Sequence, residues 1–259
     1  MPKVRWLAKS DEDLKLANTL KIEITEQLSS EDFTLVKEPK DDSSFENKDF
    51  LKLIPPTQYK WKPIFVDFED ALFTKQTIKR GKKDILARAI AGTKTEKLNV
   101  FDTTMGFGMD GFFLSLLGHK VVSCEKLNWL YALVLDAFAR YKSGPMALGQ
   151  SEWSIEFGNS LDETVFNKIK AILDQRVDVL LCDPLFDPKR GASPKEMQLL
   201  HALSHEDDTD ESGIEFADKI FGLGSSKVVV KRPIHGKPLK SKVSYDLKGR
   251  TIRYDVYRF

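Results

Sequence analysis

Several features that mark special classes of protein are scarce in this sequence of 259 residues. It has only two cysteines, Cys124 and Cys182, which excludes a disulfide-rich secreted framework. Both cysteines lie in apolar runs, which predicts reduced core residues. No run approaches the ~18 consecutive apolar residues of a transmembrane helix. Residues 1–12 contain no apolar segment that would indicate export. We therefore expect a cytoplasmic protein that makes no contact with a membrane.

An excess of either charge is also missing. The chain has 40 basic and 39 acidic residues, a formal net charge of +1, so it cannot bind nucleic acid through bulk charge. Any such binding must come from local patches. The four histidines are scattered, and no group of histidines and cysteines has the spacing of metal ligands, so we expect no metal site. An apolar content of 41% is ordinary for a globular core.

Residues 1–62 differ from the rest and predict a small α+β region. Ser10 followed by three acidic residues is typical of a helix N-terminus, and we expect this helix to continue to residue 20. Short strands are expected at residues 33–36 and 50–54. About sixty residues bury little surface, so this region is expected to pack on the remainder of the chain.

Residues 63–259 predict one α/β domain in which strands alternate with helices. This alternation is typical of a mostly parallel sheet with helices on both faces. Two final strands separated by Lys248-Gly249 predict an antiparallel hairpin at one edge. The expected strands lie at residues 98–101, 120–124, 155–157, 177–182, 227–230, 242–245 and 251–257, and the main helices at 84–91, 112–117, 130–141, 161–173, 194–203 and 214–221.

The first chemical signal is a glycine turn directly after the strand at residues 98–101. Asp102 opens it, and Gly106 and Gly108 let the backbone approach a ligand closely. Glu125 follows the next strand, where a carboxylate can accept both ribose hydroxyls of an adenosine. Together these residues predict a nucleoside-binding unit. The alternative is a plain glycine turn that serves packing only.

The acidic residues of the turn, Asp102 and Asp110, indicate which nucleoside-containing ligand binds. A dinucleotide site would require a third glycine, and Asp110 stands where it would repel a diphosphate. An acid at the start of the loop instead suits a ligand with an ammonium group. S-adenosylmethionine carries an ammonium, a sulfonium and a ribose but no phosphate, and is the expected cofactor.

Asn159 and Ser160 form a weaker signal after the strand at residues 155–157. In a methyltransferase-type sheet this loop contacts the adenine, which a small polar side chain can bind by a hydrogen bond. The same residues also suit the cap of the next helix. The two interpretations are compatible.

The catalytic signal is Asp183-Pro184-Leu185-Phe186, at the end of the most apolar strand. It looks like motif IV of amino-methyltransferases. Asp183 and the Pro184 carbonyl can accept the two N–H bonds of an exocyclic amine and orient its lone pair, while Phe186 can stack on the base. Catalysis would then consist mainly of positioning. The alternative is an ordinary turn that ends a strand.

Two basic segments precede and follow this turn in the sequence. Lys79, Arg80, Lys82 and Lys83 lie before the first helix of the main domain, and Lys231 and Arg232 end a strand. Ten basic and two acidic residues lie between 227 and 259. Such segments can hold phosphates, although each could also be plain solvated surface. Their occurrence on both sides of one catalytic turn favours RNA as the partner.

Together these segments resemble the ribosomal small-subunit methyltransferase J family. The resemblance runs from about residue 64 to 257, through Phe65-Val66-Asp67-Phe68, the glycine turn, Glu125-Lys126, Asp183–Phe186 and residues 228–233. It implies a Rossmann-like class I S-adenosylmethionine-dependent fold with a seven-stranded sheet. It also implies methylation of the exocyclic N2 of a guanosine in 16S rRNA, with the rRNA or the small ribosomal subunit as partner. The family's cofactor contacts then fall on Met109, Asp110, Glu125, Lys126, Asn159, Ser160 and Asp183.

Two alternatives remain open from the sequence. The enzyme could methylate another RNA or DNA amine, or a ribose hydroxyl, for which Lys231 beside Asp183 would be a hint. The chain could also be an inactive RNA-binding assembly factor, because Met109 replaces the arginine usual in the family. The retained Glu125 and Asp183 argue against inactivity.

The first basic segment gives a testable prediction. Replacing Lys79, Arg80, Lys82 and Lys83 together with glutamine should weaken RNA binding and flatten its salt dependence, because fewer counterions are released on binding. Affinity for S-adenosylmethionine should not change. Filter binding across a salt series measures the effect, and an unaltered slope would assign these residues to plain surface.

Overall fold

The computed structural model describes residues 3–40, 48–70, 79, 81–93, 96–144, 152–184, 195–203, 216, 218–240 and 242–259. The chain divides into two compact units. The first combines residues 1–70, 127–147 and 190–205, and the second combines residues 71–126, 148–189 and 206–259. The first unit thus includes two segments from later in the chain. The domain boundary expected after residue 62 stays a prediction. Among the described residues, no helix has both the length and the apolar character needed to cross a bilayer.

The first unit contains a four-stranded sheet in the order β2-β1-β3-β4, in which only β4 is antiparallel to its neighbour. The helix and two strands predicted here are confirmed, and β1 and β2 are additional. The helix begins as expected, since the Ser10 side chain accepts a hydrogen bond from the Asp13 backbone N–H. The elements are β1 (Val4–Leu7), α1 (Asp11–Thr19), β2 (Glu23–Ile24), β3 (Phe33–Pro39), β4 (Asp49–Ile54), the 3-10 helix η1 (Thr57–Tyr59), α5 (Asn128–Ser143) and α7 (Lys195–Leu203).

Helix α5 belongs to this first unit through a buried arginine. The Arg140 guanidinium lies 3.8 Å from the ring centroid of Phe50 on β4, and its Nη2 donates to the Val66 carbonyl. One turn earlier, Asp136 accepts a hydrogen bond from the Leu51 backbone N–H and pairs with Arg140 at 2.9 Å. These contacts attach a helix from the middle of the chain to strands from its beginning.

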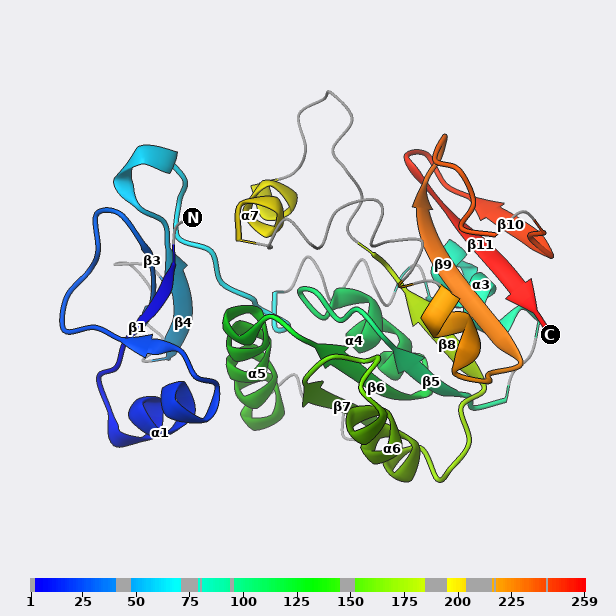
Figure 1. The fold of residues 1–259 in the computed structure, drawn as a ribbon, viewed down its shortest axis with the longest axis horizontal. Coiled ribbons are helices and arrows are strands. Elements are labelled where there is room, and N and C mark those ends of the chain that lie inside the picture. Colours follow the sequence, from blue (N-terminus) through cyan, green and yellow to red (C-terminus); the bar gives the residue numbers. More distant parts are fainter. Residues whose placement is uncertain are drawn as a thin grey trace. The chain divides into compact units, whose positions relative to one another are not determined.

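The second unit contains the seven-stranded sheet expected from the sequence, in the order β10-β11-β9-β8-β5-β6-β7 (Figure 1). Strand β11 alone runs opposite to the other six strands, which confirms the terminal hairpin at one edge of a mostly parallel sheet. The elements are the 3-10 helix η2 (Gly81–Lys83), α3 (Ile85–Ala91), β5 (Asn99–Asp102), α4 (Met109–Leu116), β6 (Lys120–Glu125), β7 (Glu152–Phe157), α6 (Glu163–Ile172), β8 (Val179–Cys182), β9 (Lys227–Pro233), β10 (Tyr245–Lys248) and β11 (Ile252–Arg258). Strand β10 lies at 245–248 rather than the expected 242–245, because the tight turn at Gly249 pairs Lys248 with Arg253 of β11.

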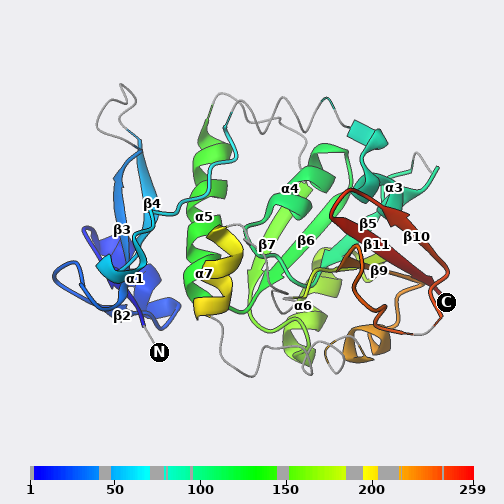
Figure 2. The same ribbon diagram turned by 90° about the horizontal axis from the view of Figure 1, so that it is seen from above.

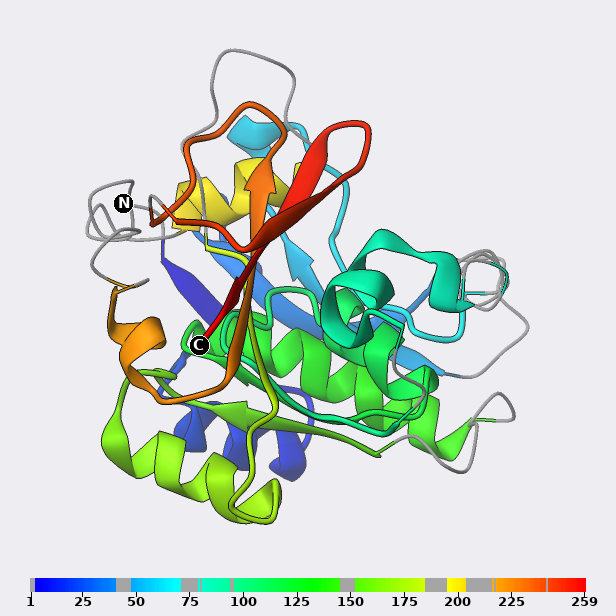
Figure 3. The same ribbon diagram turned by 90° about the vertical axis from the view of Figure 1, so that its right-hand side faces the viewer.

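Helices of the second unit cover both faces of its sheet. Figure 3 shows α6 on one face and α3 and α4 on the other, and Figure 2 shows α4 lying over β6 and β7. On the α6 face, Phe101, Val122 and Leu180 from three adjacent strands pack with Ile169 in a fully apolar cluster. Because side chains alternate along a strand, the neighbouring residues Asp102 and Ser123 face α4.

A buried chain of polar groups lies under α4. The Trp153 indole Nε1 donates to Ser123 Oγ at 3.0 Å, and Ser123 Oγ donates to Asp102 Oδ2 at 2.9 Å. All three residues are buried. A side chain at Gly111 on α4 would not fit here, since a Cβ atom would lie 2.2 Å from Ser123 Oγ. The glycine therefore lets the helix approach the sheet closely at this point.

This close approach predicts the effect of a single methyl group. Gly111→Ala should lower the free energy of unfolding by about 1–3 kcal/mol, the cost of overpacking, as measured by denaturant titration. Gly222→Ala is the matched control, because nothing lies within 4 Å of its added Cβ. It should leave stability unchanged or slightly higher. In a Ser123→Ala background the cost of Gly111→Ala should fall, and equal costs in the two backgrounds would contradict this interpretation.

Candidate active site

The loop after β5 lies across the ends of two neighbouring strands. The Thr103 backbone N–H donates to the Leu181 carbonyl of β8, and the Met105 N–H donates to the Cys124 carbonyl of β6, both at 2.9 Å. Gly106 and Gly108 have φ angles of +57° and +79°, a left-handed conformation that favours glycine. Gly108 is also the N-cap of α4. The predicted glycine turn thus exists, with both glycines where the backbone requires them.

Glu125 is bound directly to this turn. It is the last residue of β6, only 7% exposed, and its Oε2 accepts a hydrogen bond from the Gly106 backbone N–H at 2.9 Å. The Gly158 N–H in turn donates to the Glu125 carbonyl. The turn and the acid predicted to form a nucleoside-binding unit are therefore neighbours.

The Asp102 carboxylate turns inward, beneath the loop. It accepts hydrogen bonds from Ser123 Oγ and from the Thr104 backbone N–H. Burial raises the pKa of Asp102 to about 7, with a smaller contribution from the nearby Asp110, although the hydrogen bond from Ser123 opposes the shift. Its contact with a cofactor ammonium remains a prediction.

Asp183 directly follows β8 and is fixed by two partners. Its backbone N–H donates to Thr104 Oγ1 at 2.6 Å, and its carboxylate Oδ2 lies 2.9 Å from Lys231 Nζ. The side chain remains 37% exposed, so solvent or a ligand can reach the carboxylate. Pro184 is buried behind it, and Phe186 lies outside the described residues. Burial raises the pKa of Asp183, while the adjacent Lys231 opposes that rise.

Lys231 on β9 lies between two carboxylates. Its Nζ is 3.1 Å from Asp110 Oδ2 on the first turn of α4 and 2.9 Å from Asp183 Oδ2. Burial disfavours the ammonium charge, but the two carboxylates outweigh it and raise the pKa of Lys231 above its ordinary value. The Lys231 side chain thus pairs with Asp110 and Asp183, two other predicted site residues. The RNA contact expected from the sequence stays a prediction.

The remaining predicted residues lie at or near the same edge of the sheet. Met109 opens α4 and is half-buried, and Lys126 follows Glu125 and is exposed. Asn159 is exposed and its Oδ1 accepts a hydrogen bond from the Leu161 N–H, while Ser160 is buried. The Asn159 bond closes a turn ahead of α6, whose N-cap is Asp162, so the expectation that these two residues cap the helix is wrong. The adenine contact stays a prediction.

Residues predicted to bind RNA differ in exposure. Lys79, Lys82 and Lys83 are exposed, and Arg80 lies outside the described residues. Arg232 is only 8% exposed, which does not favour a surface contact with phosphate. The roles of these residues remain predictions.

Two comparisons of sequence identify the family. A family model described as "Putative SAM-dependent methyltransferase" matches residues 28–259. A ribosomal RNA small subunit methyltransferase J from Francisella tularensis subsp. novicida is 36% identical over 215 residues, 81% of this chain and 84% of that protein. The same enzyme from Francisella philomiragia is 32% identical over 237 residues, 90% and 94% of the two chains. This chain belongs to the small subunit methyltransferase J family. The resemblance predicted from the sequence is thereby confirmed.

The fold of this chain is also found in a solved structure. A SAM-dependent methyltransferase from Neisseria gonorrhoeae superposes with a TM-score of 0.69 over 98% of this chain and 95% of that one, at 21% identity. At that identity the likeness concerns the fold alone. The predicted α/β methyltransferase fold is confirmed.

The charges of the site fit S-adenosylmethionine, the cofactor of the family. Four acidic residues, Asp102, Asp110, Glu125 and Asp183, lie at or next to the carboxyl ends of β5, β6 and β8, and Lys231 balances part of their charge. An excess of carboxylates suits a ligand with a sulfonium and an ammonium and would repel a pyrophosphate. Among the described residues, no group of three or more histidine, cysteine or acidic side chains could hold a metal ion.

Neither cysteine of the chain has the environment of a nucleophile. Both are free and buried, in agreement with the predicted core positions. Burial raises the pKa of Cys124 to about 12 and also raises that of Cys182. Thiolate formation is therefore disfavoured at both positions.

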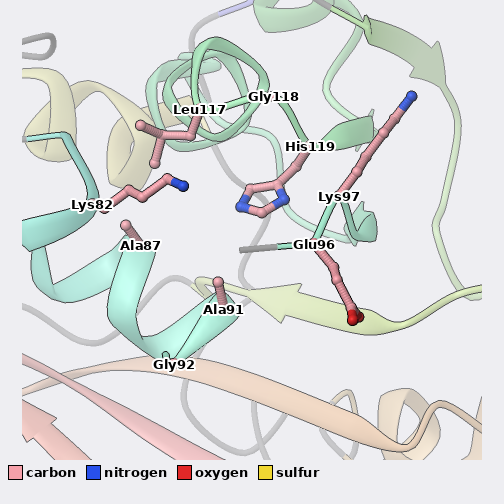
Figure 4. A pocket seen from close by; sticks show the side chains of 9 residues that line it. All are labelled: Lys82, Ala87, Ala91, Gly92, Glu96, Lys97, Leu117, Gly118 and His119. Carbon is pink, nitrogen blue, oxygen red and sulfur yellow. The ribbon is translucent and has the colours of Figure 1, made fainter. Parts of the chain in front are cut away.

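A cavity of about 220 Å³ lies at the amino ends of the parallel strands, opposite to the carboxyl ends that carry the candidate site. Lys97 and His119, which line it, come just before β5 and β6, at the amino ends of these parallel strands (Figure 4). His119 Nδ1 accepts a hydrogen bond from the Leu98 N–H, and burial together with Lys82 lowers the pKa of the imidazole. The cavity is thus separate from the candidate site at the carboxyl ends.

The Glu125 contact predicts a loss of cofactor affinity in a variant. Glu125→Ala removes both the proposed ribose acceptor and the partner of Gly106, and should weaken S-adenosylmethionine binding by roughly 1.5–3 kcal/mol. Isothermal calorimetry measures this. Glu156→Gln on β7, whose partner is the exposed Lys168, is the control and should bind normally. Unchanged affinity of a folded Glu125→Ala variant would contradict the assignment.

Proposed function

We propose that this chain transfers a methyl group from S-adenosylmethionine to the exocyclic N2 of a guanosine in 16S ribosomal RNA. The observation that carries the proposal is the position of Asp183, an accessible carboxylate at the end of β8, fixed by Thr104 and Lys231 beside the glycine turn. The names of the relatives support rRNA of the small subunit as the substrate. An rRNA substrate also agrees with the predicted cytoplasmic location.

The proposed chemistry explains why a carboxylate and a rigid proline follow the strand. The lone pair of an exocyclic amine is delocalised into the base, so the amine is a poor nucleophile. Asp183 and the Pro184 carbonyl would accept its two N–H bonds and direct the lone pair outward. S-adenosylmethionine supplies an electrophilic methyl group when bound. The protein then contributes chiefly orientation and electrostatic stabilisation.

No strong base is required for this reaction. The amine can attack before it loses its proton, so the Asp183 carboxylate acts first as a hydrogen-bond acceptor. As the N–C bond forms, the bond between the methyl carbon and the sulfonium sulfur would break, S-adenosylhomocysteine would leave, and the extra proton of the methylated amine would pass to solvent. Phe186 is proposed to stack on the guanine, a contact worth about 1–3 kcal/mol in single-stranded nucleic acid complexes. Phe186→Ala should therefore act on base placement rather than on cofactor binding.

The charge on Lys231 argues against the alternative ribose 2′-hydroxyl substrate. A lysine that removes a proton from a hydroxyl must be neutral, and a lowered pKa makes this possible. Two carboxylates within 3.1 Å instead hold the Lys231 ammonium in its charged form. The amine substrate agrees better with this arrangement.

The function itself is tested by the modified nucleoside. The purified chain should transfer labelled methyl groups from S-adenosylmethionine to 16S rRNA, either naked or in the 30S particle, and nuclease digestion should release N2-methylguanosine. Mass spectrometry identifies the product. A label on a ribose, on an adenosine or on no nucleoside of either substrate would overturn the proposal.

Asp183 gives the matching prediction for catalysis. Asp183→Ala should lower the single-turnover rate by about 10²-fold or more, the scale of losing one transition-state contact. Asp174→Asn, an exposed acid at the end of α6, is the control and should retain the wild-type rate. If Asp183→Ala turns over at a near-normal rate while folded, the segment is a structural turn.

A further inference from the structure

Lys231 lies at the centre of an ion cluster that joins three elements. Asp110 comes from the first turn of α4, Asp183 from the turn after β8, and Lys231 from β9. The Lys231 ammonium lies between the two carboxylates. Both N–O distances, 3.1 and 2.9 Å, permit charge-assisted hydrogen bonds. The Lys231 side chain is 23% exposed, so solvent screens these bonds only partly.

The groups that face the Asp183 carboxylate come from several elements. Lys231 is the cation, Asp110 on α4 and Asp102 on β5 are the carboxyls, and Tyr254 lies opposite Lys231 in the β9–β11 register. The negative charge of Asp84, the N-cap of α3, also raises the pKa of Tyr254. Burial raises the pKa of Tyr254, which therefore remains a neutral phenol. Among these described groups, Lys231 supplies the positive charge and the acids supply the negative charge.

This geometry differs from that of a surface phosphate contact. A lysine that binds a phosphate backbone needs its ammonium directed to solvent, with donors available for the phosphate oxygens. The Lys231 ammonium is directed between two carboxylates of its own chain, and Arg232 beside it is buried. The Lys231 ammonium is therefore directed into the site and not to the surface.

We propose that Lys231 is a positioning residue that holds the Asp183 carboxylate ionised and in place, and that joins the catalytic turn to the cofactor helix α4. The proposal rests on the proposed function for the role of Asp183. Lys231 contacts neither substrate nor reacting atoms in this assignment. It acts through the carboxylate that does.

The sign of its effect follows from the charges. Burial raises the pKa of Asp183 and the nearby Asp110 raises it further, while Lys231 lowers it. An opposite charge within 4–6 Å shifts a carboxyl pKa by ~1–3 units. Without Lys231 the Asp183 pKa rises, so the protonated form accumulates at a higher pH. A protonated carboxyl is a weaker acceptor for the amine, and the acid limb of the rate profile moves upward.

The test compares pH profiles of variants. Single-turnover methyl transfer to 16S rRNA is measured from pH 5 to 9 at saturating cofactor and RNA. Lys231→Met should move the acid limb up by ~1 unit or more, and Lys231→Arg should restore the limb because it keeps the charge. Asp110→Asn removes the repulsion and should move the limb down. Lys248→Met on β10, an exposed lysine, should behave as wild type.

The outcomes separate the two roles of Lys231. An unmoved profile with a raised KM for RNA and a flatter salt dependence would make Lys231 an RNA contact and overturn the proposal. A limb that moves upward in Lys231→Met and is restored in Lys231→Arg supports it. Opposite shifts in Lys231→Met and Asp110→Asn would be difficult to obtain from misfolding, which lowers the rate at every pH.

A second measurement does not depend on the substrate. In the free protein, the aspartate carboxyl carbons are labelled with ¹³C and titrated by NMR, with Asp183→Asn used to assign the Asp183 signal. Its midpoint should rise in Lys231→Met and stay in Lys231→Arg. An unchanged midpoint overturns the proposal. If wild-type protein methylates no rRNA while the midpoint shifts, the proposed function fails and the electrostatic role of Lys231 stands.

Discussion

Strand β5 pairs in parallel with β6 on one side and with β8 on the other, and the candidate site depends on this pairing. Parallel strands end at the same edge of a sheet. The glycine turn, Glu125 and Asp183 therefore meet there, although Thr104 and Asp183 are 79 positions apart in the sequence. The loop after β5 then donates to carbonyls of both neighbouring strands, which fixes its backbone before any ligand is bound. Without the pairing, none of these contacts could form.

Charge is distributed unevenly at this edge. Asp102 lies deep beneath the loop, where burial brings its pKa to about 7, while Asp183 remains accessible and paired. Asp102 ends β5 and Asp183 follows β8, so the two aspartates lie at the ends of neighbouring strands but in different environments. The Trp153–Ser123–Asp102 chain anchors the buried acid, and the Lys231 ammonium anchors the accessible one. Each carboxylate is orientated by a partner that comes from a different strand.

Much of this could be predicted from the sequence, because the relevant signals are local. Apolar runs separated by helical periodicity predict six of the seven strands of the large sheet at their observed places, while β10 begins three residues later than expected. Gly106 and Gly108 mark backbone that requires a left-handed φ. The partners of the site residues could not be predicted. Ser123 and Trp153 belong to no motif, and their contacts arise from the register between strands. Thr104 lies within the glycine turn, but its bond to Asp183 depends on the pairing of β5 with β8. The basic residues around Lys231 in the sequence predict an RNA contact, and that role stays a prediction. The sequence does not show that the fold places the Lys231 ammonium between two acids.

The two units are interleaved along the chain. Helix α5, whose Arg140 packs on Phe50, is translated only after β5, α4 and β6 of the other unit. A nascent chain leaves the ribosome from its N-terminus. The four-stranded sheet therefore emerges long before its helix, and Phe50 lacks its Arg140 contact while more than a third of the other unit is made. Assembly of this protein consequently cannot proceed as two successive folding events, one for each unit.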